Sequence, residues 1–331
     1  MKDNRAAFVG VAGVIMMLAG TVQAGDTDQR RAVEAQSRSS LASKAALRRL
    51  ERGPAREAQV VADALLSSIP ADVIPVQATR QRGQGGVLRI NGNNDAYLEI
   101  SADAASGRYY NSPALTGVEL NARKADGELI SIARAVVDEK LVPGLQIMKD
   151  ELYPIMVRHQ IHTNIERATG ATTRQVLSSE VVFGRRIDDV PVIGPGSKIF
   201  VELSNDGELV SYGFDWSPLR IGNESQPLAT VATVVERAAR TLGTPPNVGE
   251  FSRFECGYYD QGQGRGSPNL QSACLAQLVT RDANGAIVQA VEEYVPAGDI
   301  VAVDAAWPLS EIVNGRAPAS PAAPPSGPAR P

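Results

Sequence analysis

Two adjacent aspartates, a glycine-rich turn and a lysine lie close together in this sequence, and such residues could perform acid–base or phosphate chemistry. Asp188 and Asp189 precede the segment Gly194-Pro-Gly-Ser-Lys198. In a phosphate-binding loop the lysine follows a second glycine, Ser or Thr comes next, and the loop joins a strand to a helix. Here the lysine follows a serine and strand-like sequence comes next, so phosphate binding is not predicted. The aspartates favour a tight turn; a carboxylate pair for acid–base work or calcium is the alternative.

The sequence from 198 to 215 predicts a β-hairpin that uses this lysine structurally. Asp206-Gly207 is a strong signal for a two-residue turn between alternating strands. Pairing outward from that turn places apolar residues opposite each other on one face: Leu203 with Val210, Val201 with Tyr212, and Ile199 with Phe214. A one-residue shift would expose this apolar set to water. We therefore expect this register, in which Lys198 is a cross-strand partner of Asp215 rather than a catalytic amine.

The two histidines could form part of a metal site. On a helix, His159, His162 and Glu166 would share one face. Apolar residues instead alternate with polar ones from 155 to 166, which predicts a strand whose two histidines point to opposite faces. We therefore predict no metal site. The sequence also lacks a His-Glu-x-x-His zinc motif and a Gly-x-Ser-x-Gly nucleophile motif, so we predict no catalytic residues and no cofactor.

The loop from 257 to 266 is the strongest candidate for ligand binding, through Tyr258, Tyr259, Asp260 and Arg265. Aromatic side chains followed by flexible polar residues are typical of binding loops on a rigid scaffold. An edge strand followed by a solvent-exposed loop is the alternative. This loop lies between Cys256 and Cys274, the two cysteines of the chain, which we expect to form a structural disulfide.

Composition and the N-terminus indicate the compartment. The 331-residue chain has a formal net charge of -4, which argues against a nucleic-acid partner. A basic start, an apolar run and the small-residue ending Val22-Gln-Ala24 predict a signal peptide cleaved after Ala24. No other apolar stretch approaches membrane-spanning length. We therefore expect a secreted or periplasmic protein with no transmembrane segment in the mature chain.

Periodicity predicts two successive helix-plus-antiparallel-sheet modules preceded by a helical N-terminal segment, an α+β fold. One helix should begin near Asp126 with Ile130, Ala133, Val137 and Leu141 on its apolar face, and the other near Pro227, ending at Gly243. The expected divisions are a signal peptide (1–24), a helical segment (25–70), a linker with short strands (71–125), the two modules (126–220 and 221–313), and a disordered Pro/Ala-rich tail (314–331).

One segment resembles a known family. The stretch Phe183-Gly-Arg-Arg-Ile-Asp-Asp-Val-Pro-Val-Ile-Gly-Pro-Gly-Ser-Lys198, with Asp206-Gly-Glu-Leu-Val210 and Trp216 after it, resembles the PepSY/FTP-type propeptide modules of secreted thermolysin-like metalloproteases. The motif positions are Asp188, Asp189, Pro191, Gly194, Gly196, Lys198, Asp206, Gly207, Asp215 and Trp216. The resemblance implies cystatin-like modules, each with a helix laid on a curled antiparallel sheet.

The resemblance also implies a function. Such modules bind or inhibit secreted peptidases or other envelope proteins, so it implies a non-enzymatic binding protein with a protein partner. An extracellular glycan- or surface-binding module that uses Tyr258 and Tyr259 is the alternative. A hydrolase with an unfamiliar site ranks third.

Overall fold

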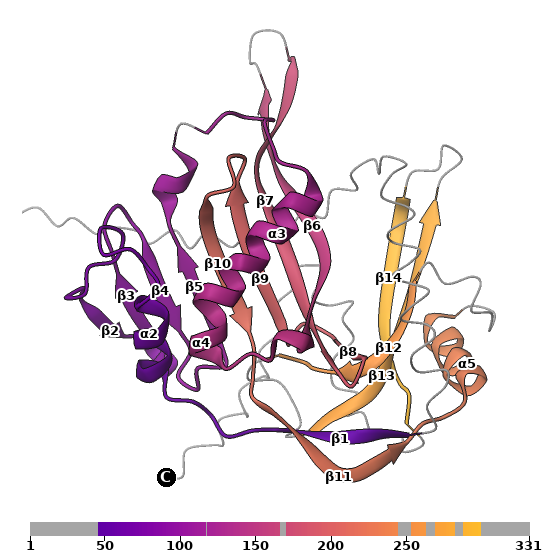
Figure 1. Ribbon diagram of the computed structural model, residues 1–331. Coiled ribbons are helices and arrows are strands. Elements are labelled where there is room, and N and C mark those ends of the chain that lie inside the picture. The colour runs from indigo at the N-terminus through magenta and orange to yellow at the C-terminus, as the bar shows by residue number, and fades with distance from the viewer. Residues whose placement is uncertain are drawn as a thin grey trace, which may run out of the picture.

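A computed structural model describes residues 46–116, 118–165, 170–243, 253–262, 269–281 and 287–298 (Figure 1). These residues form a 14-stranded sheet. The prediction of two separate α+β modules behind a helical N-terminus is therefore wrong. The predicted signal peptide, the tail from 314 onward, Glu166 and Arg265 lie outside the described residues.

The strands are β1 (Ala46–Arg52), β2 (Arg80–Arg82), β3 (Leu88–Asn91), β4 (Tyr97–Ile100), β5 (Ser106–Tyr110), β6 (Leu152–Ile165), β7 (Thr172–Ile187), β8 (Val190–Ile193), β9 (Lys198–Ser204), β10 (Leu209–Asp215), β11 (Leu219–Pro227), β12 (Arg253–Tyr259), β13 (Asn269–Arg281) and β14 (Ile287–Pro296). The α-helices are α2 (Ala58–Leu66), α3 (Asp126–Val136), α4 (Val142–Leu145) and α5 (Val231–Leu242). A π-helical turn, Val137–Leu141, joins α3 to α4.

The sheet has two wings that meet at β8. The first wing contains β2, β3, β4, β5, β10, β9, β7 and β6 in spatial order, all antiparallel. The second wing contains β12, β13 and β14, and β1 pairs with β13 on one side and with β11 on the other. The short strand β8 pairs antiparallel with β7 and parallel with β12, so it makes one sheet of the two wings.

Helices cover one face of each wing. In Figure 1, α3 lies across the first wing, where it contacts β6, β7 and β9, while α5 packs on β13 and β14 of the second wing. The helix side of the first wing buries Leu129, Ala133, Val137 and Leu141. Three of these residues were predicted for the buried face, and Leu129 replaces the predicted Ile130. No helix of the described residues covers the opposite face of the first wing, and we call it the helix-free face.

The predicted hairpin is confirmed with one local difference. Val201 pairs with Tyr212, Ile199 pairs with Phe214, and Lys198 lies opposite Asp215. A bulge near the turn pairs Leu203 with Leu209 instead of Val210. All six predicted apolar side chains are nevertheless buried, at 3% exposure or less.

The N-terminal segment corrects the helical prediction for residues 25–70. Residues 46–52 form β1, which pairs with β11 and β13, because Leu47 and Leu50 are buried while the arginines between them reach solvent. Residues 25–45 of the predicted helical segment lie outside the described residues. Within the described part, the helix prediction is confirmed for α2, where Val61 and Leu65 are buried. Tertiary pairing therefore overrides local helix propensity in β1.

The region from 71 to 125 was predicted as a linker with short strands, and the second module as starting with a helix near Pro227. The first contains four short strands, β2 to β5, all of which belong to the sheet. In the second, β11 continues to Pro227, and α5 begins after the N-cap Thr230, whose side chain accepts a hydrogen bond from the Thr233 N–H. The helix ends, as predicted, at Gly243, whose φ of 68° is left-handed.

Candidate functional site

Of the predicted binding loop, the structure describes residues 257–262 and places them mostly in the interior. Tyr258 and Asp260 are only 2% and 0% exposed. Tyr259 is half-buried, with its ring centroid 4.6 Å from that of Tyr294. The glycan-binding hypothesis requires these side chains at the surface, and the burial of Tyr258 and Asp260 argues against it. Cys256 and Cys274 form the predicted disulfide across paired strands β12 and β13.

The buried Asp260 carboxylate holds the junction of the two wings together. Its Oδ1 accepts hydrogen bonds from Arg52 at 2.5 Å and from the Gly262 N–H at 3.0 Å, and its Oδ2 accepts one from Ser197 Oγ at 2.7 Å. A Cβ at Gly196 would lie 2.4 Å from the Asp260 Cγ. The Gly-Pro-Gly turn therefore packs against a carboxylate of the protein itself.

The two predicted turns have the expected geometry. Asp188 and Asp189 connect β7 to β8 with φ values of 50° and 64°, the left-handed conformation that aspartate tolerates in tight turns. Gly207 has a φ of 89° in the β9–β10 hairpin. Asp188 and Asp189 are exposed. The turn interpretation therefore accounts for both aspartates.

Trp216 is an interior residue held by two arginines. It is 2% exposed, and the Arg185 guanidinium lies 4.7 Å from its ring centroid. Arg185 also pairs with Glu151 at 2.7 Å, and Arg56 donates to the Trp216 carbonyl oxygen. Burial lowers the pKa values of both guanidinium groups. Both guanidinium groups therefore make their contacts inside the protein.

The helix-free face carries a row of aromatic and arginine side chains. The Arg89 guanidinium lies 4.2 Å from the Tyr97 ring centroid, Tyr97 lies 5.8 Å from Tyr110, and Arg108 lies 5.8 Å from Tyr110. Glu99 of β4 lies opposite Arg89 of β3 and Arg108 of β5 in the strand register, and it forms an ion pair with Arg89 at 3.1 Å. The tyrosines are half-buried, and Arg108 is exposed. Tyrosine and arginine are the residue types enriched at protein interfaces.

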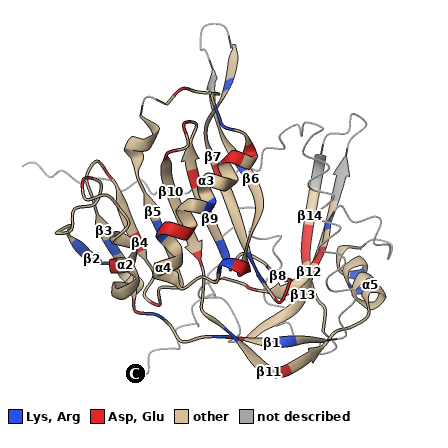
Figure 2. Cartoon of the chain, in the orientation of Figure 1, with Lys and Arg blue, Asp and Glu red and all other residues tan. Residues whose placement is uncertain are grey.

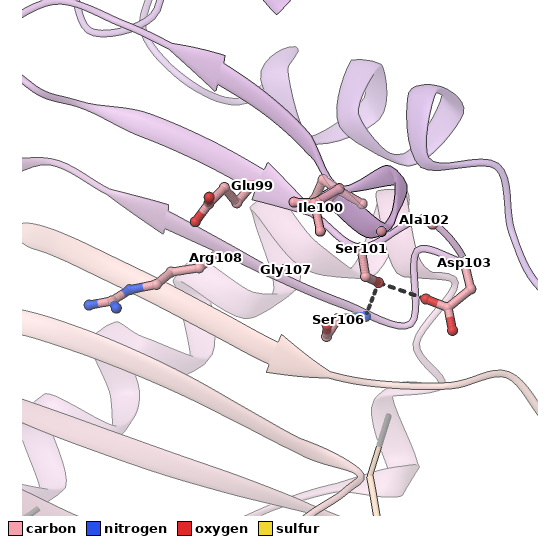
Figure 3. A pocket seen from close by; sticks show the side chains of 10 residues that line it. Glu99, Ile100, Ser101, Ala102, Asp103, Ser106, Gly107 and Arg108 are labelled. Carbon is pink, nitrogen blue, oxygen red and sulfur yellow. Dashed lines mark hydrogen bonds between the residues drawn. The ribbon is translucent and has the colours of Figure 1, made fainter. Parts of the chain in front are cut away.

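A shallow pocket of about 620 Å³ includes Glu99 and Arg108 of this face in its lining (Figure 3). Glu99 and Arg108 line one side of it. On the other side, Ser101 Oγ donates to Asp103 Oδ1 at 2.7 Å and accepts a hydrogen bond from the Ser106 N–H at 3.0 Å. Since Ser101 and Asp103 stabilise their own loop, the pocket offers mainly Glu99 and Arg108 to a ligand.

A second polar cluster lies where the helix-free face meets the second wing, and we call it the crease. Tyr153, Arg186 and Lys198 come from the first wing. Arg253 and Glu255 of β12 interact electrostatically with Tyr153 and with Lys198. Arg253 also interacts with Tyr294 of β14. Charged residues of both signs occur on both wings (Figure 2). Burial raises the pKa values of Tyr153 and Tyr294 above the usual range.

Lys198 is the most perturbed cation of the crease. Its Nζ donates to the carbonyl oxygens of Val192 and Gly196, at 3.0 and 3.1 Å. Burial lowers its pKa to about 8, and the negative charge of Asp260 acts against that shift. Titratable groups with shifted pKa values concentrate at functional sites. Because the Lys198 amine donates hydrogen bonds to β8 and to the Gly-Pro-Gly turn, Lys198 has a structural role at the crease.

This shift predicts a pH-dependent stability. Between pH 8 and 10.5 the unfolded chain keeps the Lys198 proton while the folded chain has lost it, so the free energy of unfolding should rise with pH. The rise is at most about 3.5 kcal/mol, at about 1.4 kcal/mol per pKa unit, and smaller where water reaches the amine. Urea unfolding of the wild type and Lys198→Met from pH 7 to 9.5 measures it. Parallel pH profiles for the two proteins would contradict the assignment.

The histidines occupy a strand, as predicted. His159 Nδ1 lies 2.9 Å from Ser179 Oγ, and His162 is exposed in the outer half of β6. No group of three or more potential metal ligands occurs among the described residues. Within the same residues, no helix has the length and apolar character needed to cross a membrane.

None of the site residues predicted from the sequence belongs to the aromatic–arginine row. A signal for it was present in the sequence, because residues 96–100 and 108–110 alternate between two faces. Leu98 and Tyr109 face the core, which leaves Tyr97, Glu99 and Tyr110 on the other side.

Comparisons with known proteins give little information about this chain. No protein-family model matches it, and no curated protein matches it. Among solved structures, it is similar to an uncharacterized protein from Eubacterium rectale ATCC 33656, with 7% sequence identity and a TM-score of 0.47, over 77% of this chain and 85% of that chain.

Proposed function

We propose that this chain is an exported, non-enzymatic binding protein that engages another protein through the helix-free face of its first wing. The observation that carries the proposal is the row formed by Arg89, Tyr97, Tyr110 and Arg108, in which each guanidinium lies over a tyrosine ring. Rigid aromatic side chains with stacked arginines bind protein surfaces at low cost in conformational entropy. Export is supported by the predicted signal peptide and by the disulfide.

A secreted peptidase is the partner class that the resemblance to PepSY/FTP modules supports. Residues 183–216, which carry that resemblance, run from the end of β7 through β10 at the centre of the first wing. Since the chain does not form two cystatin-like modules, the proposal takes only the partner class from the resemblance.

The test measures binding of the mature chain, starting after Ala24, to a panel of secreted peptidases that includes a thermolysin-like metalloprotease. Arg108→Glu is expected to weaken binding about tenfold or more, because it reverses a charge at the edge of the row. Arg82→Glu is the matched control. This exposed arginine pairs with the buried Leu88 and therefore lies on the other side of the sheet.

Residual peptidase activity in the same mixtures separates inhibition from simple binding. Absence of binding across the whole panel would exclude a peptidase partner. Equal losses of affinity in the two arginine variants would exclude the helix-free face as the interface.

A further inference from the structure

Small residues of β10 lie on the helix-free face between aromatic side chains of the two neighbouring strands. Ser211 lies opposite Tyr110 of β5, and Gly213 lies opposite Phe200 of β9. Gly213 is partly exposed, and a Cβ placed on it would meet other heavy atoms only at 3.7 and 3.9 Å. Tyr97 extends the aromatic side beyond Tyr110. We call these five residues the aromatic strip.

The aromatic strip is suited to a proline-rich segment. Tyr97, Tyr110 and Phe200 are all half-buried, so each ring still offers part of its surface to a ligand. Segments with proline at every third residue bind aromatic-lined surfaces as a polyproline II helix, which is largely ordered before it binds. Glu99, on the same strand as Tyr97, already pairs with Arg89. The available contacts are therefore the rings rather than this carboxylate.

The sequence contains such a segment in its Pro/Ala-rich tail. The prolines recur at every third residue in two sets: Pro318, Pro321 and Pro324, followed by Pro325, Pro328 and Pro331. Because a polyproline II helix has three residues per turn, each set would lie along one edge of such a helix. Arg330 is the single ionisable side chain between 317 and 331. The tail therefore has both the repeat and the low charge that the aromatic strip favours.

The length of chain before the tail allows it to reach the strip of the same molecule. Ala297, next to the last described residue, donates its N–H to the Ser272 carbonyl oxygen of β13. In the sheet order β13-β12-β8-β7-β9-β10, β10 is five strand spacings away, or about 24 Å. A flexible chain with the 20 peptide links from Gly298 to Pro318 has an average end-to-end distance of about 25 Å. Since the two lengths match, this attachment gives the tail a local concentration of about 1 mM at the strip.

We infer that the proline-rich segment 318–331 docks on the aromatic strip of its own chain as a polyproline II helix, and that it competes there with the protein partner. This inference rests on the function proposed above, because it concerns regulation of the same face. Proline rings would pack on Tyr97, Tyr110 and Phe200, and the backbone of the segment would lie over Gly213. A partner would then bind only to the fraction of molecules whose tail has left the strip.

Paramagnetic relaxation in NMR spectra tests the docking without any partner. In the mature chain, starting after Ala24, a nitroxide on Ser326→Cys should broaden the backbone amide signals around Gly213. The amide of Thr173, at the start of β7, should stay sharp. Alanine at all six prolines of the two sets should remove the broadening, because the preformed helix and its rings are lost.

A mixed sample distinguishes docking within one chain from binding to a second copy. It contains nitroxide-labelled chains without ¹⁵N and ¹⁵N-labelled chains without nitroxide, so any broadening in it requires contact between two molecules. We expect the signals around Gly213 to stay sharp in this mixture.

Variants of the sheet locate the site. Gly213→Val should weaken the docking about tenfold or more, because a branched side chain would occupy the strip, while the space around its Cβ allows the fold to be kept. Ser225→Val is the matched control, since it adds the same side chain at an exposed position of β11, at the other end of the sheet. Circular dichroism and thermal melting verify the fold, and Gly213→Ala replaces Gly213→Val if that variant unfolds.

The peptidase panel described above tests the regulation. If the separate tail binds the strip with a dissociation constant of about 0.1 mM, a local concentration of about 1 mM lowers the apparent affinity for the partner about tenfold. The chain with alanine at the six prolines should therefore bind a peptidase partner about tenfold more tightly than the wild type. Equal affinities of the two chains would overturn the regulatory part of the inference.

Four results of the NMR experiments would overturn the docking. The wild-type chain could show no broadening around Gly213, the broadening could arise in the mixed sample, it could persist after the prolines are replaced, or Ser225→Val could reduce it as much as Gly213→Val. If no peptidase binds, the proposed partner class is wrong, whereas the docking of the tail is still decided by these spectra.

Discussion

Asp260→Ala is expected to lower the free energy of unfolding by about 3 kcal/mol, since removing one partner of a buried ion pair leaves the other charge uncompensated. The carboxylate is fully buried, whereas the Arg52 side chain is 22% exposed, which places the expected loss at the lower end of the range for buried pairs. The substitution also removes the acceptor of Ser197 and Gly262. Chemical denaturation measures the loss directly.

A double-mutant cycle with Arg52→Ala isolates the contribution of the pair itself. The exposed pair between Arg49 and Glu224 is a suitable control, because their side chains are 37% and 75% exposed. We expect Glu224→Ala to change stability by less than about 1 kcal/mol. If Asp260→Ala costs no more than Glu224→Ala, the buried carboxylate does not hold the wings together as described.

Gly257→Ala should destabilise the protein by about 3 kcal/mol, because the added methyl group has no space at the junction of the wings. A Cβ at Gly257 would lie 2.0 Å from the carbonyl oxygen of Pro191. That atom belongs to the backbone of β8, so the clash is relieved only by moving β12 away from β8. Thermal unfolding followed by circular dichroism detects the loss.

The same substitution at Gly127 is the control, and the opposite sign is expected there. Gly127 lies in the first turn of α3, and a Cβ at this position would have no heavy atom within 4 Å. Alanine in a helix is favoured over glycine by up to about 1 kcal/mol. A stabilising Gly127→Ala beside a destabilising Gly257→Ala would show that space at the junction, and not the loss of glycine itself, is responsible. Equal effects would contradict this explanation.

The sequence predicted the local elements of the first wing better than their assembly. The hairpin from β9 to β10 was predictable because its turn and its alternation agree, so only one register buries Val201, Ile199 and their partners. By contrast, β1 pairs with strands that lie far along the chain, and its short arginine-rich sequence is compatible with a helix. Nothing local in residues 46–52 specifies partners at 219–227 and 269–281.

The joining of the two wings into one sheet also could not be predicted from local sequence patterns. The parallel pairing of β8 with β12 involves Val192 with Tyr258 and Ile193 with Tyr259. So short a contact leaves no periodic signal in the sequence. The contact depends on Gly257 and on the buried Asp260. The sequence predicted both residues in a surface loop, because glycine and aspartate are common in surface loops as well as at buried turns.

The position of β1 has a consequence for the kinetics of folding. This strand fills the space between β11 and β13, so the sheet closes only when nearly the whole described chain is available. A chain that emerges N-terminus first must leave Leu47 and Leu50 without their partners until β13 has followed. Pairing between such distant segments slows folding. Under the export proposed above, such slow closure would keep the chain open while it crosses a membrane.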